Sequence, residues 1–370
     1  MKKLENKKVA IICDWLKDFG GAEIVISHLM EIFPDADIFS SVFFMGENKI
    51  FLNKNIKTSF IQKIPFLNKS HKLALTLRPI AFESFDLSSY DIVISSSSAE
   101  SKGIITKPNT IHFSYCHTPT RYFWSHYHEY INMLEFGFLN PLAKYLIPKI
   151  INKLRIWDYI ASQRVDYFIA NSQNTKNRIL KYYNKNSEVI YPGIDIKSIP
   201  FSEEKGDYYF YNGRCVPYKK FDLIVEAFNK NGKKIIIETN TDNKLYRKLK
   251  SISNSNIIWK FNLPKDELNN LLSKAKGFIF PVDEDFGLAP IFAMASGTPV
   301  IALKKGGALE TIIDGKTGIF FDNQNIRQLN NALEKFETME FDAKYIRNYS
   351  LNFDKKIFKQ KIVDFIENKI

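Results

Sequence analysis

Two cations in one short segment are the side chains best suited to chemistry on a phosphate. Arg214 and Lys219 lie five positions apart between Asn212 and Lys220, after an apolar run and before a helical pattern. The planar fork of an Arg and the point charge of a Lys can hold a diphosphate from two sides. At a breaking bond they would neutralise the charge on a phosphate leaving group. The alternative is a solvated basic loop.

Paired glycines follow the first apolar run of the chain. Gly20 and Gly21 precede a helical pattern from Ala22 to about Ile32. Such glycines let the backbone approach a ligand, and the helix N-terminus offers N–H groups to an anion. The spacing is neither G-x-G-x-x-G nor G-x-x-x-x-G-K-[ST], so nicotinamide binding has no direct support. An ordinary turn between a strand and a helix is the alternative.

An acidic turn and a histidine also follow apolar runs. Asp283, Glu284 and Asp285 are consecutive and precede a helix expected to begin near Leu288, whose N–H groups could meet a phosphate or hydroxyl. With no His nearby in the sequence, these acids make a weak metal site, and a solvated turn is the alternative. His117 follows a predicted strand, at the position where loops of parallel sheets carry function, although a lone His is more often structural. We expect a helix to begin at Thr118 and Pro119, directly after it.

Short apolar runs alternate with segments of helical spacing along almost the whole chain. Continuous apolar runs without polar alternation are typical of parallel strands covered on both faces. The pattern predicts an α/β fold of two facing, doubly wound, Rossmann-like domains, with a ligand in the cleft at the carboxyl ends of their strands. The predicted strands are 8–13, 91–95, 111–116, 167–170, 208–211, 234–237, 278–280 and 300–302.

The length of 370 residues suits two such domains. Turn-favouring residues at Tyr191 to Gly193 and at Pro200 indicate the join, and the last segment has the apolar spacing of an amphipathic helix. We therefore predict an N-terminal domain of residues 1–170 plus 353–370, a linker region of 171–204 and a C-terminal domain of 205–352.

Composition restricts the partners and the compartment. Lys and Arg number 52 against 40 Asp and Glu, so the net charge of +12 predicts an anionic partner. Cys13, Cys116 and Cys215 are too scattered for a metal cluster or a disulfide framework, which favours a reducing compartment. The first apolar run is too short for a signal peptide, and no run reaches membrane-spanning length. We expect a cytoplasmic protein.

Together these segments resemble the family 4 retaining glycosyltransferases of the GT-B fold. The resemblance covers nearly the whole chain: DWLKDFGGAE, YCHTPTRYFW, YNGRCVPYKKFDLIVEAF and PVDEDFGLAP match family blocks in order. The first two blocks are most similar to bacterial mannosyltransferases that use GDP-mannose in O-antigen, lipopolysaccharide or other surface-polysaccharide assembly. The resemblance implies a hexosyltransferase whose co-substrate is a nucleotide sugar, with GDP-mannose as the expected donor.

The resemblance also implies roles in the N-terminal half. Gly20 and Gly21 resemble the loop that approaches the diphosphate of the donor and the acceptor. His117 resembles the residue that hydrogen-bonds a hydroxyl of the donor sugar near the reacting carbon.

In the C-terminal half, Arg214 and Lys219 resemble the pair that holds the pyrophosphate and assists its departure. Glu284 matches the first Glu of the family signature, two Glu separated by seven residues, and would bind sugar hydroxyls. The remaining donor contacts implied are the backbone N–H groups of Phe286, Gly287 and Leu288.

One position departs from the family pattern. Phe292 stands where the second Glu of the signature, which usually accepts hydrogen bonds from the ribose, is expected. Losing a hydrogen bond to a charged group costs about 1.5–3 kcal/mol, or roughly tenfold to a hundredfold in affinity. Donor binding is then weak, another group holds the ribose, or the protein does not turn over.

The expected mechanism relies on the leaving group. A double displacement needs a carboxylate nucleophile, and no second acid stands out near His117 or Gly20. We expect Arg214, Lys219 and helix N-termini to stabilise the departing diphosphate while the acceptor attacks from the same face. No metal or other cofactor is required in this scheme.

Basic amphipathic segments predict a lipid-linked saccharide acceptor at the cytoplasmic face of the inner membrane. Residues 48–82 contain seven Lys and Arg and no acid, and residues 141–157 contain four and no acid. Such segments suit anionic lipid, although a solubilising basic face is the alternative. No zinc-finger spacing, RNP-like motif or helix-turn-helix supports nucleic-acid binding.

Two other functions remain open from the sequence. A nucleotide-sugar 2-epimerase shares the two-domain architecture, although the segments around Gly20 and His117 fit a transferase better. An inactive, membrane-bound partner in a polysaccharide-synthesis complex would account for Phe292.

Overall fold

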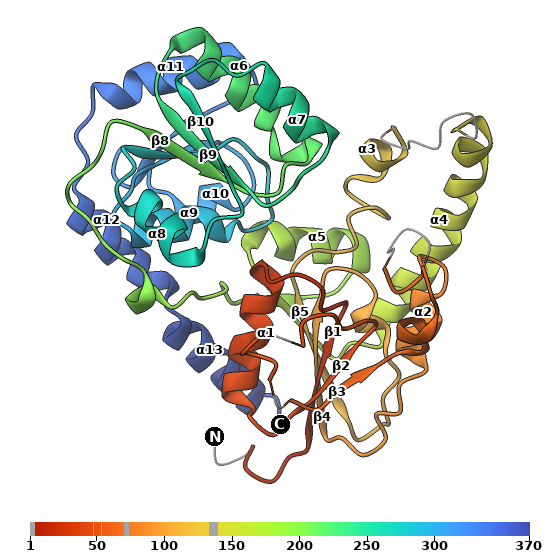
Figure 1. The fold of residues 1–370 in the computed structure, drawn as a ribbon. Coiled ribbons are helices and arrows are strands. Elements are labelled where there is room, and N and C mark those ends of the chain that lie inside the picture. The colour runs from red at the N-terminus through yellow and green to blue at the C-terminus, as the bar shows by residue number, and fades with distance from the viewer. Residues whose placement is uncertain (1–3, 47, 53, 70–73, 133–139) are drawn as a thin grey trace. The chain divides into compact units, whose positions relative to one another are not determined.

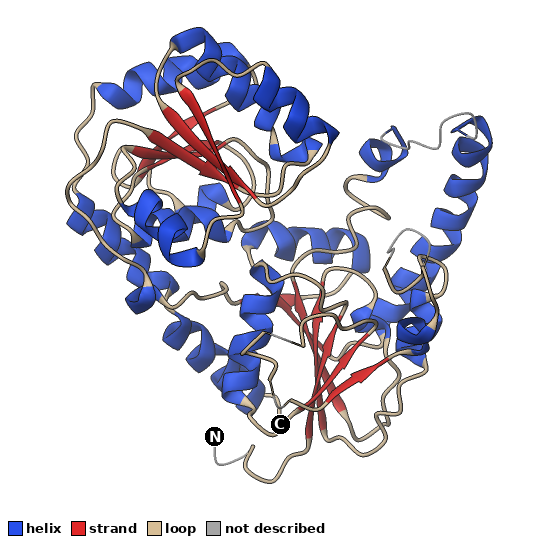
Figure 2. Ribbon diagram, in the orientation of Figure 1, coloured by secondary structure: helices blue, strands red, loops and turns tan. Residues whose placement is uncertain are grey.

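The chain forms two compact units, each built on a parallel sheet. The computed structural model describes residues 4–46, 48–52, 54–69, 74–132 and 140–370. The N-terminal unit comprises Met1–Pro192 and Phe358–Ile370, and the C-terminal unit comprises Gly193–Ile357. Figure 1 traces the chain through both units, and Figure 2 shows the strands of each sheet with helices on both faces.

The N-terminal unit has a seven-stranded sheet in the order β3-β2-β1-β4-β5-β6-β7, and every strand pair is parallel. The chain order reverses between β1 and β4, as in doubly wound folds. Its strands are β1 (Val9–Cys13), β2 (Asp37–Ser40), β3 (Ile56–Thr58), β4 (Ile92–Ser97), β5 (Ile111–Cys116), β6 (Tyr167–Ala170) and β7 (Ser187–Val189). Its helices are α1 (Gly21–Ile32), α2 (Arg78–Glu83), α3 (Tyr127–Asn132), α4 (Asn140–Gln163) and α5 (Gln173–Tyr183).

The C-terminal unit repeats this plan with a six-stranded parallel sheet in the order β10-β9-β8-β11-β12-β13. Its strands are β8 (Tyr209–Asn212), β9 (Ile235–Thr239), β10 (Ile257–Phe261), β11 (Gly277–Phe280), β12 (Val300–Leu303) and β13 (Gly318–Phe321). Its helices are α6 (Phe221–Asn231), α7 (Lys244–Ser251), α8 (Lys265–Ser273), α9 (Leu288–Ala295), α10 (Ala308–Thr311), α11 (Ile326–Glu337) and α12 (Ala343–Ser350). The last helix, α13 (Lys355–Glu367), returns to the N-terminal unit.

The structure confirms the predicted α/β class and both doubly wound halves. All eight predicted strands are present within a few residues, because their apolar side chains are buried. The sequence missed β2, β3, β7, β10 and β13. The predicted helix at Thr118 is also wrong: the segment forms turns, and α3 begins at Tyr127. The side chains of Thr120 and Trp124 there hydrogen-bond the buried carboxylate of Asp158, which holds the segment against α4.

The boundary between the units differs from the predicted one. Residues 171–204 are not a single linker, because α5 and β7 fall inside this range and β7 pairs with β6 at the edge of the first sheet. The chain enters the C-terminal unit at Gly193 and leaves it after Ile357. The backbone of Gly193 lies against Lys355, where an added Cβ would be 2.6 Å from that Cα. The two crossings of the chain therefore run close together.

None of the described helices combines the length and the hydropathy needed to cross a bilayer. All three cysteines are free and buried.

A substitution in α13 tests how the C-terminal helix contributes to the N-terminal core. Phe358 is 1% exposed and its ring packs edge-on against Tyr115, whereas the neighbouring Ile357 is 39% exposed. Phe358→Ala should lower the free energy of unfolding of the N-terminal unit by about 3–5 kcal/mol, because it leaves a cavity in the core. Urea titration followed by circular dichroism measures this. Ile357→Ala is the control and should change it by no more than about 0.5 kcal/mol; equal effects would contradict the packing described.

Candidate active site

In the C-terminal unit, two loops that carry predicted site residues leave neighbouring strands. The strand order reverses between β8 and β11, and doubly wound sheets bind ligands beyond the carboxyl ends of strands at that reversal. The loop after β8 carries Arg214 and Lys219, and the loop after β11 carries Glu284. The topology thus brings together two segments that are about 70 residues apart in the sequence.

Lys219 and Glu284 form an ion pair across these two loops. The Nζ of Lys219 donates to Oε1 of Glu284, and both side chains are about one-fifth exposed. The hydroxyl of Tyr211 donates to the carbonyl of Lys219 at 2.6 Å. Burial raises the pKa of Tyr211 well above its ordinary value, so this hydroxyl remains a donor. The Lys219 end of the loop is therefore held from both sides.

Arg214 lies in the same loop but does not share this pair. Its side chain is exposed and its Nη2 lies 3.4 Å from the hydroxyl of Tyr218. The next residue, Cys215, is fully buried, and its carbonyl accepts a hydrogen bond from Asn243 at 2.7 Å. Burial, with a smaller effect of Asp222, raises the pKa of the Cys215 thiol to about 11. The buried Cys215 is thus an anchor for the loop, and its burial disfavours the reactive thiolate.

The loop after β11 is shaped by close backbone contacts. A Cβ added at Gly307 would lie 2.2 Å from the carbonyl oxygen of Phe286, and the N–H of Gly307 donates to the carbonyl of Glu284 at 2.9 Å. Gly287 has a φ of +82°, which glycine adopts without strain, and α9 begins at Leu288. The ring of Phe286 is buried and packs on Phe353. This geometry fixes where the first turn of α9 begins. The N–H groups of that turn have no hydrogen-bond partner within the helix.

Phe292 lies in the second turn of α9 and is partly exposed. Its carbonyl accepts hydrogen bonds from the N–H and the hydroxyl of Ser296. The aromatic ring offers no acceptor for a hydroxyl, so an acceptor for ribose has to come from another residue.

In the N-terminal unit, the reversal of strand order lies between β1 and β4, and Asp14 joins the ends of these strands. Its carboxylate accepts hydrogen bonds from the backbone N–H groups of Ser98, Ala99 and Ser101 at 2.6, 3.0 and 2.8 Å. Asp14 had no predicted role, although an acid directly after a predicted strand is a usable signal. Gly20 and Gly21 are exposed at the start of α1, where the N–H of Gly20 donates to Glu23 at 2.9 Å.

His117 follows β5, as predicted, and its imidazole is oriented by neighbours. Its Nε2 lies 2.8 Å from the hydroxyl of Ser96, and its ring packs edge-on against Tyr115. The carbonyl of His117 accepts hydrogen bonds from Asn171 and Thr175. The ring is therefore positioned at the carboxyl end of the first sheet.

The structure thus brings together Lys219, Glu284 and Gly287 in one unit, with Arg214 in the same loop as Lys219. Gly306 and Gly307 had no predicted role, although a glycine doublet after an apolar run is a signal for the close backbone approach found there. The described residues contain no group of three or more His, Cys, Asp or Glu placed to hold a metal ion. Whether donor binding involves a cleft between the two domains stays a prediction.

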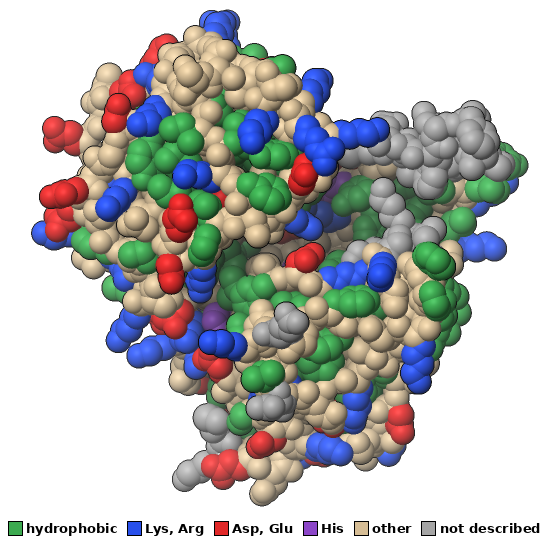
Figure 3. Space-filling view, viewed as in Figure 1, with side chains coloured by type: hydrophobic (Ala, Val, Ile, Leu, Met, Phe, Trp, Pro, Cys, Tyr) green, Lys and Arg blue, Asp and Glu red, His purple; other side chains and the backbone are tan. Residues whose placement is uncertain are grey.

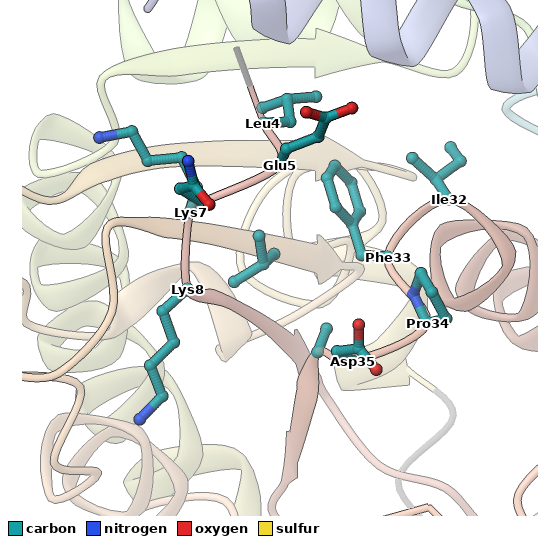
Figure 4. A pocket seen from close by; sticks show the side chains of 11 residues that line it. Leu4, Glu5, Lys7, Lys8, Ile32, Phe33, Pro34 and Asp35 are labelled. Carbon is teal, nitrogen blue, oxygen red and sulfur yellow. The ribbon is translucent and has the colours of Figure 1, made fainter. Parts of the chain in front are cut away.

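A separate pocket lies at the amino end of β1, away from the carboxyl ends of the strands that carry the predicted site residues. It is lined by residues 4–9, before and at the start of β1, and by residues 32–36, at and after the end of α1 (Figure 4). None of the predicted site residues lines it, and amino ends of parallel strands are not where doubly wound sheets bind ligands.

Sequence models of known protein families match both halves of the chain, including these loops. The sequence model described as Glycosyltransferase Family 4 matches residues 19–198, and that described as Glycosyl transferases group 1 matches residues 194–353. The chain belongs to the family 4 glycosyltransferases. The loops after β8 and β11 of this glycosyltransferase lie within the second match, and the Gly20–His117 region lies within the first.

Similar proteins agree with this family. The chain is 29% identical over 228 residues to an uncharacterized glycosyltransferase of Methanocaldococcus jannaschii, covering 59% of this chain and 63% of that protein. It is 27% identical over 218 residues to the O-antigen chain mannosyltransferase RfbU of Salmonella typhimurium, covering 55% and 60%. The matches thus span about three-fifths of either relative.

Solved structures show the GT-B fold. Anabaena HepE, in complex with UDP, matches with a TM-score of 0.69 at 16% identity, over 98% of this chain and 100% of that chain. The lipopolysaccharide outer core galactosyltransferase WaaB, in its apo form, matches with a TM-score of 0.66 at 16% identity and the same coverage. At this identity the likeness concerns the fold alone.

The close contact at Gly307 gives a test of the site geometry. Gly307→Ala should lower the melting temperature, because overpacking against the Phe286 carbonyl costs about 1–3 kcal/mol. Differential scanning calorimetry measures the shift. Gly46→Ala is the matched control, since the nearest side-chain atom would be 4.0 Å from its Cβ. An unshifted melting temperature for Gly307→Ala would show that the loop after β11 does not pack in this way.

Proposed function

We propose that this glycosyltransferase is a retaining hexosyltransferase that transfers mannose from GDP-mannose to a lipid-linked saccharide in surface-polysaccharide assembly. The observation that carries the proposal is the Lys219–Glu284 pair at the reversal of strand order, with Arg214 in the same loop. The names of two relatives support mannose: the O-antigen chain mannosyltransferase RfbU and the alpha-1,3/1,6-mannosyltransferase ALG2 of Saccharomyces cerevisiae.

The proposed mechanism depends on an exchange of partners by Lys219. In the structure its charge is balanced by Glu284. A bound diphosphate would draw Lys219 and Arg214 to its oxygens, and would release the Glu284 carboxylate to accept hydrogen bonds from sugar hydroxyls. The two cations would then stabilise the charge that develops on the leaving GDP, without a metal or another cofactor.

The acceptor attack completes the proposal. The oxygen of the acceptor hydroxyl would bond to the anomeric carbon from the face that GDP leaves, as the bond from that carbon to the phosphate oxygen breaks, which retains the configuration. The hydroxyl proton would pass to an oxygen of the departing GDP. His117, held by Ser96, would hydrogen-bond a hydroxyl of the donor sugar, and the exposed Gly20–Gly21 backbone would face the diphosphate and the acceptor.

Removing a cation from the loop after β8 tests this mechanism. Arg214→Ala and Lys219→Ala should each lower kcat/KM by about 10²–10³, because each removes a group that stabilises the leaving group. GDP release from GDP-mannose in the presence of a lipid-linked acceptor measures the rate. Arg247→Ala is the control, since Arg247 is exposed on α7 and pairs with Asp242.

Three outcomes would contradict parts of the proposal. An unchanged rate for Arg214→Ala would remove its role in the departure of GDP. Turnover of a UDP-linked or dTDP-linked sugar, and not of GDP-mannose, would overturn the donor. Tight binding of GDP-mannose with no turnover would favour the second candidate, an inactive partner, for which Phe292 is the specific observation.

The structure of residues 48–82 reduces the basic surface that the sequence led us to expect at a membrane. In residues 48–82, Arg78 is buried beside Glu100 at 3.1 Å, Lys57 pairs with Asp37 at 3.0 Å, and Phe51 and Ile61 are in the core. Lys72 and Asn53 lie outside the described residues, as do the side chains of 141–144. Part of the first basic segment therefore serves the internal structure, whereas Lys49, Lys63 and Lys69 are exposed.

One face of α4 carries exposed basic and apolar side chains, and we propose that this face contacts anionic lipid. Its exposed side chains include Lys149 and Lys153, and the apolar ones on the same arc are Tyr145, Leu146, Ile150, Ile156 and Ile160, between 37% and 63% exposed. Basic and hydrophobic side chains gather along this helix in the space-filling view (Figure 3). Apolar side chains with interspersed lysines suit the interface of an anionic membrane.

Charge reversal on this face tests the membrane contact. Lys149→Glu/Lys153→Glu should weaken binding to phosphatidylglycerol vesicles at low salt, measured by co-sedimentation, by at least about thirtyfold, since each Lys lost near such a surface contributes about 1 kcal/mol. The matched control is Lys244→Glu/Lys248→Glu, two exposed residues at the same spacing on α7. Equal losses in both variants, or binding that is insensitive to salt and anionic lipid, would reject α4 as the contact.

A further inference from the structure

A buried carboxylate without an ion pair lies next to the proposed diphosphate site. Glu238, near the end of β9, is 6% exposed. Its carboxylate accepts a hydrogen bond from the backbone N–H of Leu263, and it forms no ion pair with any Lys or Arg of the described ranges. Acidic side chains are almost never this buried unless they are paired. Such an isolated carboxylate indicates a site for a ligand that donates hydrogen bonds.

The strand register places Glu238 beside the loop of the two cations. Glu238 is the register partner of Asn212, the last residue of β8. The N–H of Gly213 donates to the carbonyl of Glu238 at 3.2 Å. On the neighbouring strand β10, the register partner of Glu238 is Lys260, with which it forms no ion pair. Glu238 thus lies one strand away from the segment that begins with Gly213 and Arg214.

The carboxylate lies on the face of the sheet that α9 covers. Ile235 and Ile237 belong to the core between the sheet and α6, and successive side chains of a strand point to opposite faces. Glu238 therefore points away from that core. Its partner Leu263 lies just before α8, and α9 packs on β11 and β12 outside the same core. The side chain is thus on the same face as the helix that carries Phe292.

Doubly wound sheets use this position to bind nucleotides. The phosphates lie at the loop after the first strand, and an acid at the end of the second strand, about 20 residues later, accepts hydrogen bonds from ribose hydroxyls. Here β8 and β9 are the first and second strands, and Glu238 follows Gly213 by 25 residues. We propose that Glu238 binds the ribose hydroxyls of the donor nucleotide. This rests on the proposed function, in which the donor is a nucleoside diphosphate sugar.

The chemistry of the neighbourhood agrees with a ribose. Phe292 has no acceptor to offer, so the hydroxyls need another carboxylate or carbonyl. Burial raises the pKa of Glu238, and two hydroxyl donors would offset that desolvation by stabilising the charged form. A diol satisfies the remaining lone pairs without bringing a second charge into the site.

Calorimetric titration with nucleotides that lack the hydroxyls tests the assignment. GDP, UDP and their 2′,3′-dideoxy analogues are titrated into the wild-type protein, Glu238→Gln, Glu238→Ala and the control Glu226→Gln, an exposed acid on α6. Wild type and control should bind the dideoxy analogue about tenfold to a hundredfold more weakly than the parent nucleotide. Both Glu238 variants should bind the parent as weakly as the analogue, and melting temperatures check that they are folded.

The possible results separate this inference from the proposed function. Equal binding of parent and dideoxy nucleotide by wild type, or full affinity for the parent in a folded Glu238→Gln, would overturn the role of Glu238 while leaving the transferase proposal intact. A hydroxyl-dependent loss seen with UDP and not with GDP would support Glu238 and overturn GDP-mannose. If wild type binds neither nucleotide, both proposals fail.

Discussion

The ion pair between Lys219 and Glu284 is the interaction on which the candidate site depends. It joins the loops after β8 and β11, which are neighbours only because the strand order reverses between these two strands. Both side chains are mostly buried, so each charge would be costly without the other. In the proposed mechanism, a diphosphate and a sugar together would supply the same compensation in another form, an anion for Lys219 and hydroxyls for Glu284. The pair can therefore hold the two loops together and still be exchanged for contacts to a ligand.

Other buried charges show how unusual an uncompensated one is in this molecule. In the N-terminal unit, Arg78 is paired with Glu100, and Lys102 donates to Asp158. Although burial opposes its charge, the nearby Glu100 raises the pKa of Arg78 above its ordinary value. Asp14 is satisfied by three backbone N–H groups. Against this background, Glu238 stands out because a backbone N–H, and no charged side chain of the described residues, compensates its carboxylate.

Part of the fold could be predicted and part could not, for physical reasons. Strands such as Val9–Cys13 and Val300–Leu303 lie inside a sheet, so burial on both faces leaves continuous apolar runs in the sequence. The edge strand Ile56–Thr58 has three residues, none of them fully buried, and its lysine pairs with Asp37. An edge strand needs no apolar run, which is why the same residues resembled part of a basic surface segment.

The sequence alone determined the fold class, the family and the loops that carry the candidate residues, because each loop lies between an apolar run and a helical pattern that are local properties of the chain. Only the tertiary structure decided which charges are balanced. Lys219 and Glu284 are 65 positions apart, and their contact follows from strand order. Glu238 looked like any acid near the end of an apolar run. Its isolation depends on what lies around it in three dimensions, and charge compensation cannot be counted from residues that are distant in the sequence.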